Sequence, residues 1–379
     1  MKITFVVPAG HFSGGVKVVA IYAERLQKRG HTVVVVSPDR YVPSLRERIR
    51  SVRRGGRFFQ APALSHFTGR SVDLRIYKPH RPVENRDVPE ADVIIATWFE
   101  TALWIDRLAP SKGAKAIFIQ GYETLPEEPR PEIDSAWRLP FQKIVISRWL
   151  KDLAVSKFGD VEAAHVPNSV DTSQFFAPER GMQAAPTVGF LSAESPFKGM
   201  KTALAAVAKM RETLPNLKVV SFGQEATHGA LALPPNSEFH LLPPQDTIRD
   251  LYAKCDLWLC GSQREGFHLP PLEAMACRCP VVSTRVGGPE DIIVPGKNGY
   301  LVETGDADGL AKAAVEILTG GAENWRRFSD AALATATGYT WDDATVSFEA
   351  ALQKAVDRAG RGEIAGGRRT LSMSARTSS

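Results

Sequence analysis

Cysteine is scarce in this sequence of 379 residues, and its four cysteines all lie in one short stretch. No two of them form a C-x-x-C pair, and no histidine stands near them at zinc-finger spacing. These features favour buried, reduced thiols in a cytoplasmic protein over metal ligation. The four residues are Cys255, Cys260, Cys277 and Cys279.

Long apolar runs are absent as well, and none approaches the ~20 residues that a membrane-spanning helix needs. The short apolar run at residues 3–7 has no small-residue cleavage site after it, so we expect a first strand and not a signal peptide. The hydrophobic fraction of 44% and the charged fraction of 23% are typical of a soluble globular protein. A chain of 379 residues is too long for one ordinary core, which predicts two domains.

Two common nucleotide-binding patterns are missing. The sequence has neither G-x-G-x-x-G nor a P-loop Gly-Lys-Ser/Thr, so neither a classical dinucleotide site nor an ATPase is indicated. It also lacks a helix-turn-helix, a zinc finger and an aromatic RNP pattern, which argues against a nucleic-acid partner.

The net charge of +5 is modest, but arginines are concentrated in residues 46–59, which also contain the Phe58-Phe59 pair. This segment is either a solvated loop or helix face, or a basic and apolar patch that touches anionic lipid or a polyanionic acceptor. Peripheral contact with the inner face of a membrane is therefore a possible role of residues 46–59. The arginines are Arg46, Arg48, Arg50, Arg53, Arg54 and Arg57.

The hydrophobic pattern predicts strands that alternate with helices in two halves. Residues 3–7, 16–26 and 32–37 read as strand, helix and strand, with later strands at 92–96, 116–119 and 144–146. The pattern restarts after turn-forming segments at 167–171 and 178–186, which look like a linker. The second half has strands at 188–191, 217–222, 257–260, 280–283 and 300–302, and helices at 201–212, 306–318 and 323–335.

We therefore predict an α/β protein built from two Rossmann-like, doubly wound domains that face a cleft. The N-terminal domain covers residues 1–168 and the C-terminal domain covers residues 169–341. A last amphipathic helix covers residues 342–358. Residues 359–379 are rich in Gly, Arg, Ser and Thr and are expected to be a disordered tail.

The most informative stretch is residues 264–274, in which Glu265 and Glu273 are separated by seven residues. Glu265 lies on a glycine-containing loop after a buried apolar run, and Glu273 lies in the expected helix 270–276. A strand, loop and helix in this order point backbone N–H groups and a positive helix end at an anion. Two carboxylates beside it could accept hydrogen bonds from a sugar and from a ribose diol, which suits a nucleoside-diphosphate sugar.

Other positions are consistent with phosphate binding. Gly14 and Gly15 precede the first helix, where they form either a phosphate contact or only a tight turn. Lys198 is expected at a helix start, an unfavourable place for a cation, which favours a role in neutralising a diphosphate. The loop Gly287-Gly288 would again present backbone N–H groups to a phosphate or sugar.

Asp306 and Asp308 form an Asp-x-Asp pattern of the kind that binds Mn²⁺ or Mg²⁺ in some sugar transferases. Because they open a helix, we interpret them as capping residues. No metal ion is expected.

Taken together, these motifs resemble family 4 glycosyltransferases, which are retaining enzymes with the GT-B fold. The similarity extends to about residue 358. The segments that carry it are Gly14-Gly15, Pro167-Asn168-Ser169-Val170-Asp171, Phe197-Lys198-Gly199, residues 264–274, Val286-Gly287-Gly288-Pro289-Glu290 and residues 296–302.

The resemblance implies a role for each matched position. Glu265 would contact hydroxyls of the donor sugar, Glu273 the ribose diol and Lys198 the diphosphate. The final helix would cross back onto the N-terminal domain, and no metal or other cofactor would be needed. The remaining donor-binding positions would be Gly14, Gly15, Arg264, Gly266, Phe267, His268 and Leu269.

The sequence departs from the family pattern at two places. Ser192-Ala193 replaces a Gly-Arg pair that many relatives carry, and Arg264 is a candidate substitute for that phosphate contact. Gln120 takes the place of a histidine, and the Gln-x-Tyr-Glu segment that it begins is similar to that of rhamnosyltransferases of bacterial surface glycans.

The resulting expectation is a cytoplasmic enzyme that transfers a hexose from a nucleoside-diphosphate sugar to a glycan or lipid-linked glycan. The expected hexose is rhamnose or mannose, and its anomeric configuration is retained. Surface polysaccharide synthesis is the expected context. Two alternatives stay open, a nucleotide-sugar 2-epimerase and a non-catalytic subunit that binds sugar nucleotides. The expected catalytic residues are Glu265, Lys198 and Gln120, and the expected acceptor contacts are Trp98, Tyr122 and Glu123, with Glu100 and Trp149 also plausible.

Overall fold

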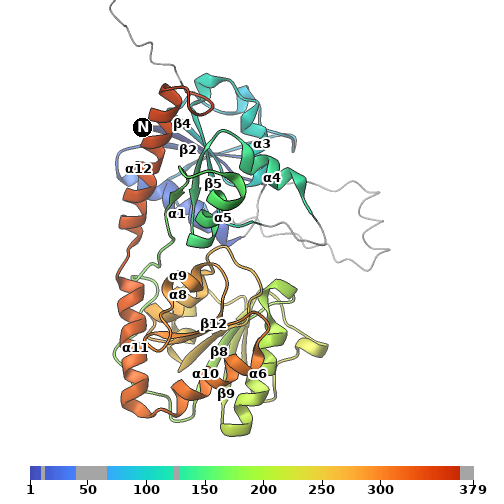
Figure 1. The fold of residues 1–379 in the computed structure, drawn as a ribbon, viewed down its shortest axis with the longest axis vertical. Helices are drawn as coiled ribbons and strands as arrows, with labels where there is room; N and C mark the ends of the chain where they lie inside the picture. Colours follow the sequence, from blue (N-terminus) through green and yellow to red (C-terminus); the bar gives the residue numbers. More distant parts are fainter. Residues whose placement is uncertain (10–12, 40–65, 123–128, 368–379) are drawn as a thin grey trace, which may run out of the picture. The chain divides into compact units, whose positions relative to one another are not determined.

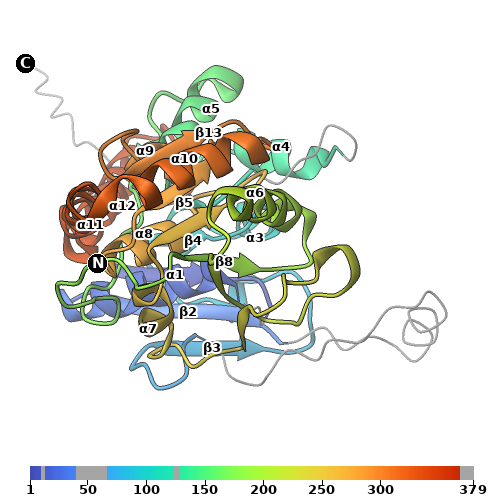
Figure 2. The same cartoon turned by 90° about the horizontal axis from the view of Figure 1, so that it is seen from below.

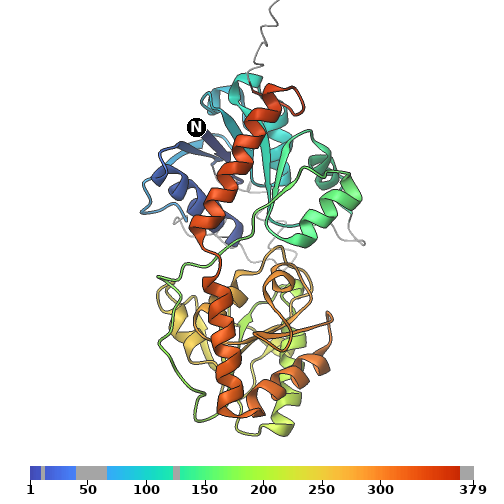
Figure 3. The ribbon, with the colours of Figure 1, turned by 60° about the vertical axis from the view of Figure 1, so that its left-hand side comes forward.

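The computed structural model describes residues 1–9, 13–39, 66–122 and 129–367. Its contacts divide the chain into two units (Figures 1 and 3). The first unit consists of Met1–Val145, Lys151–Val166 and Thr345–Ser379, and the second of Ile146–Leu150 and Pro167–Ala344. Residues 46–59 and Glu123 lie outside the described residues.

A seven-stranded, fully parallel sheet forms the centre of the first unit, in the order β3-β2-β1-β4-β5-β6-β7. The chain winds outward from β1 in one direction and from β4 in the other, as in doubly wound folds. The strands are β1 (Lys2–Val6), β2 (Thr32–Pro38), β3 (Asp73–Tyr77), β4 (Val93–Ala96), β5 (Ala114–Ile119), β6 (Gln142–Val145) and β7 (Ala164–His165). The helices are α1 (Gly14–Lys28), α3 (Phe99–Asp106), α4 (Pro131–Arg138) and most of α5 (Arg148–Phe158) and of α12 (Trp341–Gly360).

The central strands of this sheet are buried and mostly apolar, because helices cover a doubly wound sheet on both faces. All residues of β4, β5 and β6 are buried, and β1 is buried after its first residue. The edge strand β3 is largely exposed, and its apolar residues are interrupted by the charged Asp73 and Arg75. The hydrophobic pattern therefore did not reveal it.

Helix α12 packs against the first unit through an aromatic cluster. The ring of Phe348 stacks on Tyr22 with centroids 4.3 Å apart and meets Phe118 edge-on at 5.1 Å. At the same turn Glu349 accepts hydrogen bonds from Arg29 Nε at 2.6 Å and pairs with His31 Nε2 at 2.9 Å. Packing of an amphipathic face, more than helix propensity, stabilises such a helix.

The expected disordered tail is wrong for residues 359–367. Ile364 is buried, Ala365 N donates to Pro140 O at 2.8 Å, and Ala365 O accepts from Lys115 N at 2.9 Å. These bonds satisfy backbone groups at the start of β5, so composition alone misjudged the segment. Residues 368–379 lie outside the described residues.

The second unit contains a six-stranded parallel sheet in the order β10-β9-β8-β11-β12-β13, with its topological switch between β8 and β11. Its strands are β8 (Thr187–Ser192), β9 (Lys218–Gly223), β10 (Glu238–Leu241), β11 (Leu257–Cys260), β12 (Val281–Thr284) and β13 (Gly299–Val302). Its helices are α6 (Met200–Thr213), α7 (Ile248–Ala253), α8 (Leu269–Ala276), α9 (Gly288–Ile292), α10 (Ala307–Thr319) and α11 (Gly321–Thr337). Figure 2 shows α6 beside α10, and Trp325 and Phe328 of α11 belong to the same core as Val188 and Leu257.

The segment 167–171 is an integral part of the second unit and not a free linker. Asn168 and Ser169 are buried, and Ser169 Oγ donates to Tyr339 O at 2.6 Å. None of the helices in the described ranges is long and apolar enough to cross a membrane.

Candidate functional site

Several of the predicted site residues meet at the carboxyl edge of the second sheet. Loops after β8, β11 and β12 lie side by side there, because parallel neighbouring strands end at the same edge. The loop after β8 carries Lys198 in the 3-10 turn η3 (Pro196–Lys198), and the loop after β11 carries Glu265. The edge coincides with the β8–β11 switch, the usual ligand position in open α/β sheets.

Glu265 is the centre of this cluster. Its side chain is 9% exposed, and both carboxylate oxygens pair with Lys198 Nζ, at 2.9 and 3.0 Å. Ser262 Oγ donates to Oε1 at 2.9 Å, and His268 Nδ1 lies 3.1 Å from the same oxygen. A nearly buried carboxylate is thus surrounded by donors from two loops.

The donors keep this carboxylate ionised. Burial alone would raise the pKa of Glu265. The charge that His268 carries in acid, the charge of Lys198 and the hydrogen bonds from Lys198 and Ser262 outweigh burial and hold the pKa below its usual value. Burial lowers the pKa of His268 to about 4, so its imidazole is neutral at neutral pH. Since a carboxylate only accepts, Nδ1 carries the proton and Nε2 is left as an acceptor.

Glycines allow these loops to pack backbone against backbone. Gly199 has a φ of +61°, and a Cβ there would stand 1.6 Å from Gly261 O. A Cβ on Gly288 would stand 2.0 Å from Phe267 O. The loop Gly287-Gly288 therefore packs directly against the backbone of the Glu265 loop.

Glu273 lies on α8, is nearly buried, and accepts a hydrogen bond from Tyr252 Oη at 3.0 Å. Tyr252 is fully buried, and burial raises its pKa well above the usual value, so it remains a donor. Sequence reasoning missed this tyrosine because α7 was not predicted. An apolar helical pattern over residues 248–253 was the available signal.

Arg264, Gly266 and Phe267 lie on the same loop as Glu265, because they are its neighbours in sequence. The Arg264 guanidinium lies 6.0 Å from the centroid of the Phe197 ring, and Phe197 is the residue before Lys198. Gly266 O accepts from Trp149 Nε1 at 3.1 Å, and Phe267 is buried. Trp149 was expected to contact an acceptor from the N-terminal half; it groups instead with the second unit and holds the Glu265 loop.

The first unit brings together Gln120 and Gly15, which are 105 positions apart. Gln120 Nε2 donates to Gly15 O at 3.1 Å, and a Cβ on Gly15 would stand 3.2 Å from that nitrogen. Ser13 Oγ caps α1 by accepting from Val16 N at 3.3 Å. The hydrogen bond to Gly15 O occupies one N–H of the Gln120 amide and holds this side chain against the start of α1.

The two described acceptor candidates of the first unit, Tyr122 and Trp98, differ in their contacts. Tyr122 Oη donates to Asp134 Oδ1 at 2.6 Å and also contacts Lys157 Nζ, and its ring packs edge-on against Trp137. Trp98 is the N-cap residue of α3 and lines a small cavity with Gln120.

Asp306 caps α10, since its Oδ1 accepts from Gly309 N at 2.8 Å, which confirms the capping interpretation. Asp308 pairs with Lys209 at 2.7 Å. Within the part of the chain that the structure describes, no three His, Cys, Asp or Glu side chains gather as they would around a metal ion.

The family model described as Glycosyl transferases group 1 matches residues 175–334, which lie within the second unit. N-acetyl-alpha-D-glucosaminyl L-malate synthase of Bacillus anthracis is 47% identical over 77 residues, 20% of each chain. GDP-mannose-dependent alpha-(1-6)-phosphatidylinositol monomannoside mannosyltransferase of Mycolicibacterium smegmatis is 29% identical over 46% of this chain and 52% of its own. The chain thus spans about half or less of the length of these curated relatives.

Solved structures match over nearly the whole chain. Sucrose-phosphate synthase from Thermosynechococcus elongatus has a TM-score of 0.69 at 13% identity, over 95% of this chain and 100% of its own. Anabaena HepE in complex with UDP and glucose has a TM-score of 0.68 at 18% identity, over 93% and 100%. The fold is therefore GT-B, as the sequence predicted.

Proposed function

We propose that this chain is a glycosyltransferase that moves a hexose from a nucleoside-diphosphate sugar to a glycan or lipid-linked glycan. The observation that carries the proposal is the ionised, nearly buried Glu265, held by Lys198, Ser262 and His268 at the switch point of a glycosyl transferases group 1 domain. Such a carboxylate can accept hydrogen bonds from hydroxyls of a sugar. A structural ion pair alone would not need to lie at this edge.

In the proposed complex, Lys198 neutralises the departing diphosphate. Its ammonium has three N–H groups, so it can bind a phosphate oxygen while still contacting Glu265. Arg264 would supply the second cation in place of Ala193. Stabilisation of the leaving group is the main contribution of the protein to catalysis, without a metal ion.

The ribose diol of the donor would bind Glu273, which Tyr252 orients. We further propose that transfer proceeds with retention on the front face of the sugar, with the leaving diphosphate assisting deprotonation of the acceptor hydroxyl. Gln120 would contact the donor sugar, and Trp98 and Tyr122 the acceptor.

Mannose is the better supported donor sugar. Two relatives are named as mannosyltransferases, the M. smegmatis enzyme above and MMP alpha-(1->4)-mannosyltransferase of Mycolicibacterium hassiacum, 29% identical over 55% of this chain. Rhamnose, surface polysaccharide synthesis and a cytoplasmic location, with peripheral membrane contact through residues 46–59, remain part of the proposal.

The test uses the purified full chain with UDP-, GDP-, dTDP- and ADP-sugars and a panel of glycan and lipid-linked acceptors, with and without EDTA. Release of the nucleoside diphosphate and the anomeric configuration of the product, read by NMR, are measured. Glu265→Gln should lose transfer by at least ~100-fold, as expected when a transition-state contact is removed. Lys312→Ala, an exposed cation of the same unit, is the matched control and should retain wild-type turnover.

Three results would overturn the proposal. Wild-type turnover in Glu265→Gln would remove Glu265 from the mechanism. An isomerised sugar nucleotide formed without an acceptor would identify a 2-epimerase. Tight nucleotide binding without turnover on any acceptor would identify a non-catalytic subunit.

A further inference from the structure

The two carboxylate oxygens of Glu265 have different surroundings. Three groups contact Oε1, namely Lys198 Nζ at 2.9 Å, Ser262 Oγ at 2.9 Å and His268 Nδ1 at 3.1 Å. In the part of the chain that the structure describes, Oε2 is paired with Lys198 Nζ alone, at 3.0 Å. A carboxylate oxygen has two lone pairs, so Oε1 has no capacity left, whereas Oε2 can accept one more hydrogen bond.

Ser262, one of the groups on Oε1, is itself held from the neighbouring strand. Thr284, the last residue of β12, donates its hydroxyl to Ser262 O at 2.5 Å. Both residues are buried, so bulk water does not compete for these bonds. Two successive hydrogen bonds therefore lead from Thr284 through Ser262 to one oxygen of Glu265.

The backbone of His268 indicates that the third contact on Oε1 has a purpose. His268 has a φ of +69°, in the left-handed region that favours glycine. Its side chain is nearly buried against Glu265. A glycine would avoid the backbone strain but would leave this side of the carboxylate uncovered, and such strain is concentrated at functional sites.

A role in folding alone does not account for the asymmetry. Lys198 contacts both oxygens and by itself neutralises the carboxylate. The contacts of Ser262 and His268 fall on Oε1 and fix the orientation of the carboxylate, yet they leave a nearly buried acceptor with an unused lone pair. An unused acceptor of this kind costs free energy unless a ligand or water fills it.

We propose that Glu265 accepts one sugar hydroxyl through Oε2, and that Ser262 and Thr284 are positioning residues that hold the carboxylate in this orientation. The inference rests on the proposed function, because it needs a sugar at the Glu265 site. Neither Ser262 nor Thr284 touches the ligand, and both act through Glu265.

The test is calorimetric titration of the full chain with GDP-mannose and GDP, and with UDP-glucose and UDP. For each pair, the ratio of the two dissociation constants measures what the sugar contributes to binding. Ser262→Ala should reduce that contribution about fivefold, as expected for the loss of about one hydrogen bond, and should leave the affinity for GDP or UDP within about twofold. Thr284→Val should act in the same direction, and Thr284→Ser, which keeps the hydroxyl, should give the wild-type ratio.

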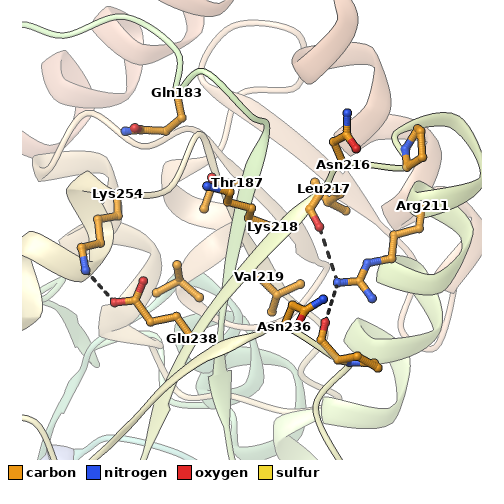
Figure 4. Close-up of a pocket in the computed structure, with 13 residues that line it drawn as sticks. Gln183, Thr187, Arg211, Asn216, Leu217, Lys218, Val219, Asn236, Glu238 and Lys254 are labelled. Carbon is orange, nitrogen blue, oxygen red and sulfur yellow. Dashed lines mark hydrogen bonds and ion pairs between the residues drawn. The ribbon is translucent and has the colours of Figure 1, made fainter.

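Two controls separate positioning from general packing. In a Glu265→Ala background, Ser262→Ala should change the ratio no further, because both changes act on the same carboxylate. Ser237→Ala removes a serine hydroxyl that donates to Pro234 O at 2.7 Å, just before β10 and at the opposite ends of the parallel strands. Ser237 follows Asn236, which lines the hollow drawn in Figure 4, and its variant should keep the wild-type ratio.

An unchanged ratio in both Ser262→Ala and Thr284→Val would overturn the inference, as would an equal loss of affinity for the nucleoside diphosphate and the sugar nucleotide. Additive effects in the Glu265→Ala background would also overturn it. The readout is binding and not turnover, so the inference can fail while the proposed glycosyl transfer stands. A reduced ratio in a protein that transfers no sugar would support the inference and refute transfer, and binding of neither pair would refute both.

Discussion

Replacing Lys198 by methionine tests the electrostatic account of the Glu265 site. Methionine is close to lysine in length but has no charge, so Glu265 keeps Ser262 and His268 and loses its ion pair. Removing one partner of a buried pair costs about 3–5 kcal/mol. Because the Lys198 side chain is 36% exposed, water screens the pair, and we expect a loss of about 1–3 kcal/mol in the free energy of unfolding.

The loss should depend on pH with a definite sign. In the wild type the folded-state pKa of Glu265 is lowered, so its contribution to stability is present at neutral pH and is lost as the pH falls through that value, below the ordinary 4.5. In Lys198→Met the effect of burial on Glu265 is no longer opposed by the lysine charge, so the folded-state pKa of Glu265 rises. The destabilisation is then greatest at neutral pH and shrinks as acid protonates Glu265.

His268 provides a second readout. Burial is the main reason that its pKa is about 4, the charge of Lys198 lowers it further, and the charge of Glu265 opposes both. Removing Lys198 should therefore raise the pKa of His268, which NMR titration of the imidazole measures. A protonated His268 would offset part of the lost stability.

Urea unfolding at several pH values, followed by tryptophan fluorescence, gives the free energies. The double variant Lys198→Met/Glu265→Gln closes a mutant cycle. Its difference in stability from Glu265→Gln alone should lack the part that follows the titration of Glu265 and keep only the part that follows His268. A destabilisation independent of pH, together with an unchanged pKa of His268, would refute the ion pair as the source of the effect.

Three further predictions concern packing and capping. Gly288→Ala should lower stability and abolish nucleotide binding in a titration, because its Cβ would fall 2.0 Å from Phe267 O; Gly181→Ala, in open space, should change neither. Asp306→Ala should cost about 1 kcal/mol through loss of the α10 cap, with no change in calorimetric Mn²⁺ or Mg²⁺ binding, and a lost metal signal would contradict the capping role. Ile364→Ala should cost about 2 kcal/mol in urea unfolding, and no measurable loss would mean that residues 359–367 do not pack as described.

Much of the fold could be predicted from the sequence because central parallel strands are buried on both faces. Leu257–Cys260 is apolar throughout and Val281–Thr284 is fully buried, and helices such as α1 and α10 show an amphipathic period. The pattern did not reveal β3, α4 or α7. These are short or partly exposed elements, in which contacts with the rest of the unit outweigh local preference.

The candidate site was predictable where one short segment carries it. Glu265 and Glu273 lie on one strand, loop and helix, and Lys198 was found because a cation beside a helix start needs a reason. The sequence by itself thus determined the α/β class, the doubly wound order of strands and the loops that bear the charged residues. Local spacing and hydrophobic period contain this information.

Only the tertiary structure decided which of these residues touch. Lys198 meets Glu265 across 67 positions, Tyr252 meets Glu273 from a helix that the pattern did not show, and Gln120 meets Gly15 across 105 positions. These pairs form because parallel strands bring their carboxyl ends to one edge and because glycines let the loops there approach each other. The protonation states follow from the same packing, since burial and neighbouring charge set them and neither is encoded in local sequence.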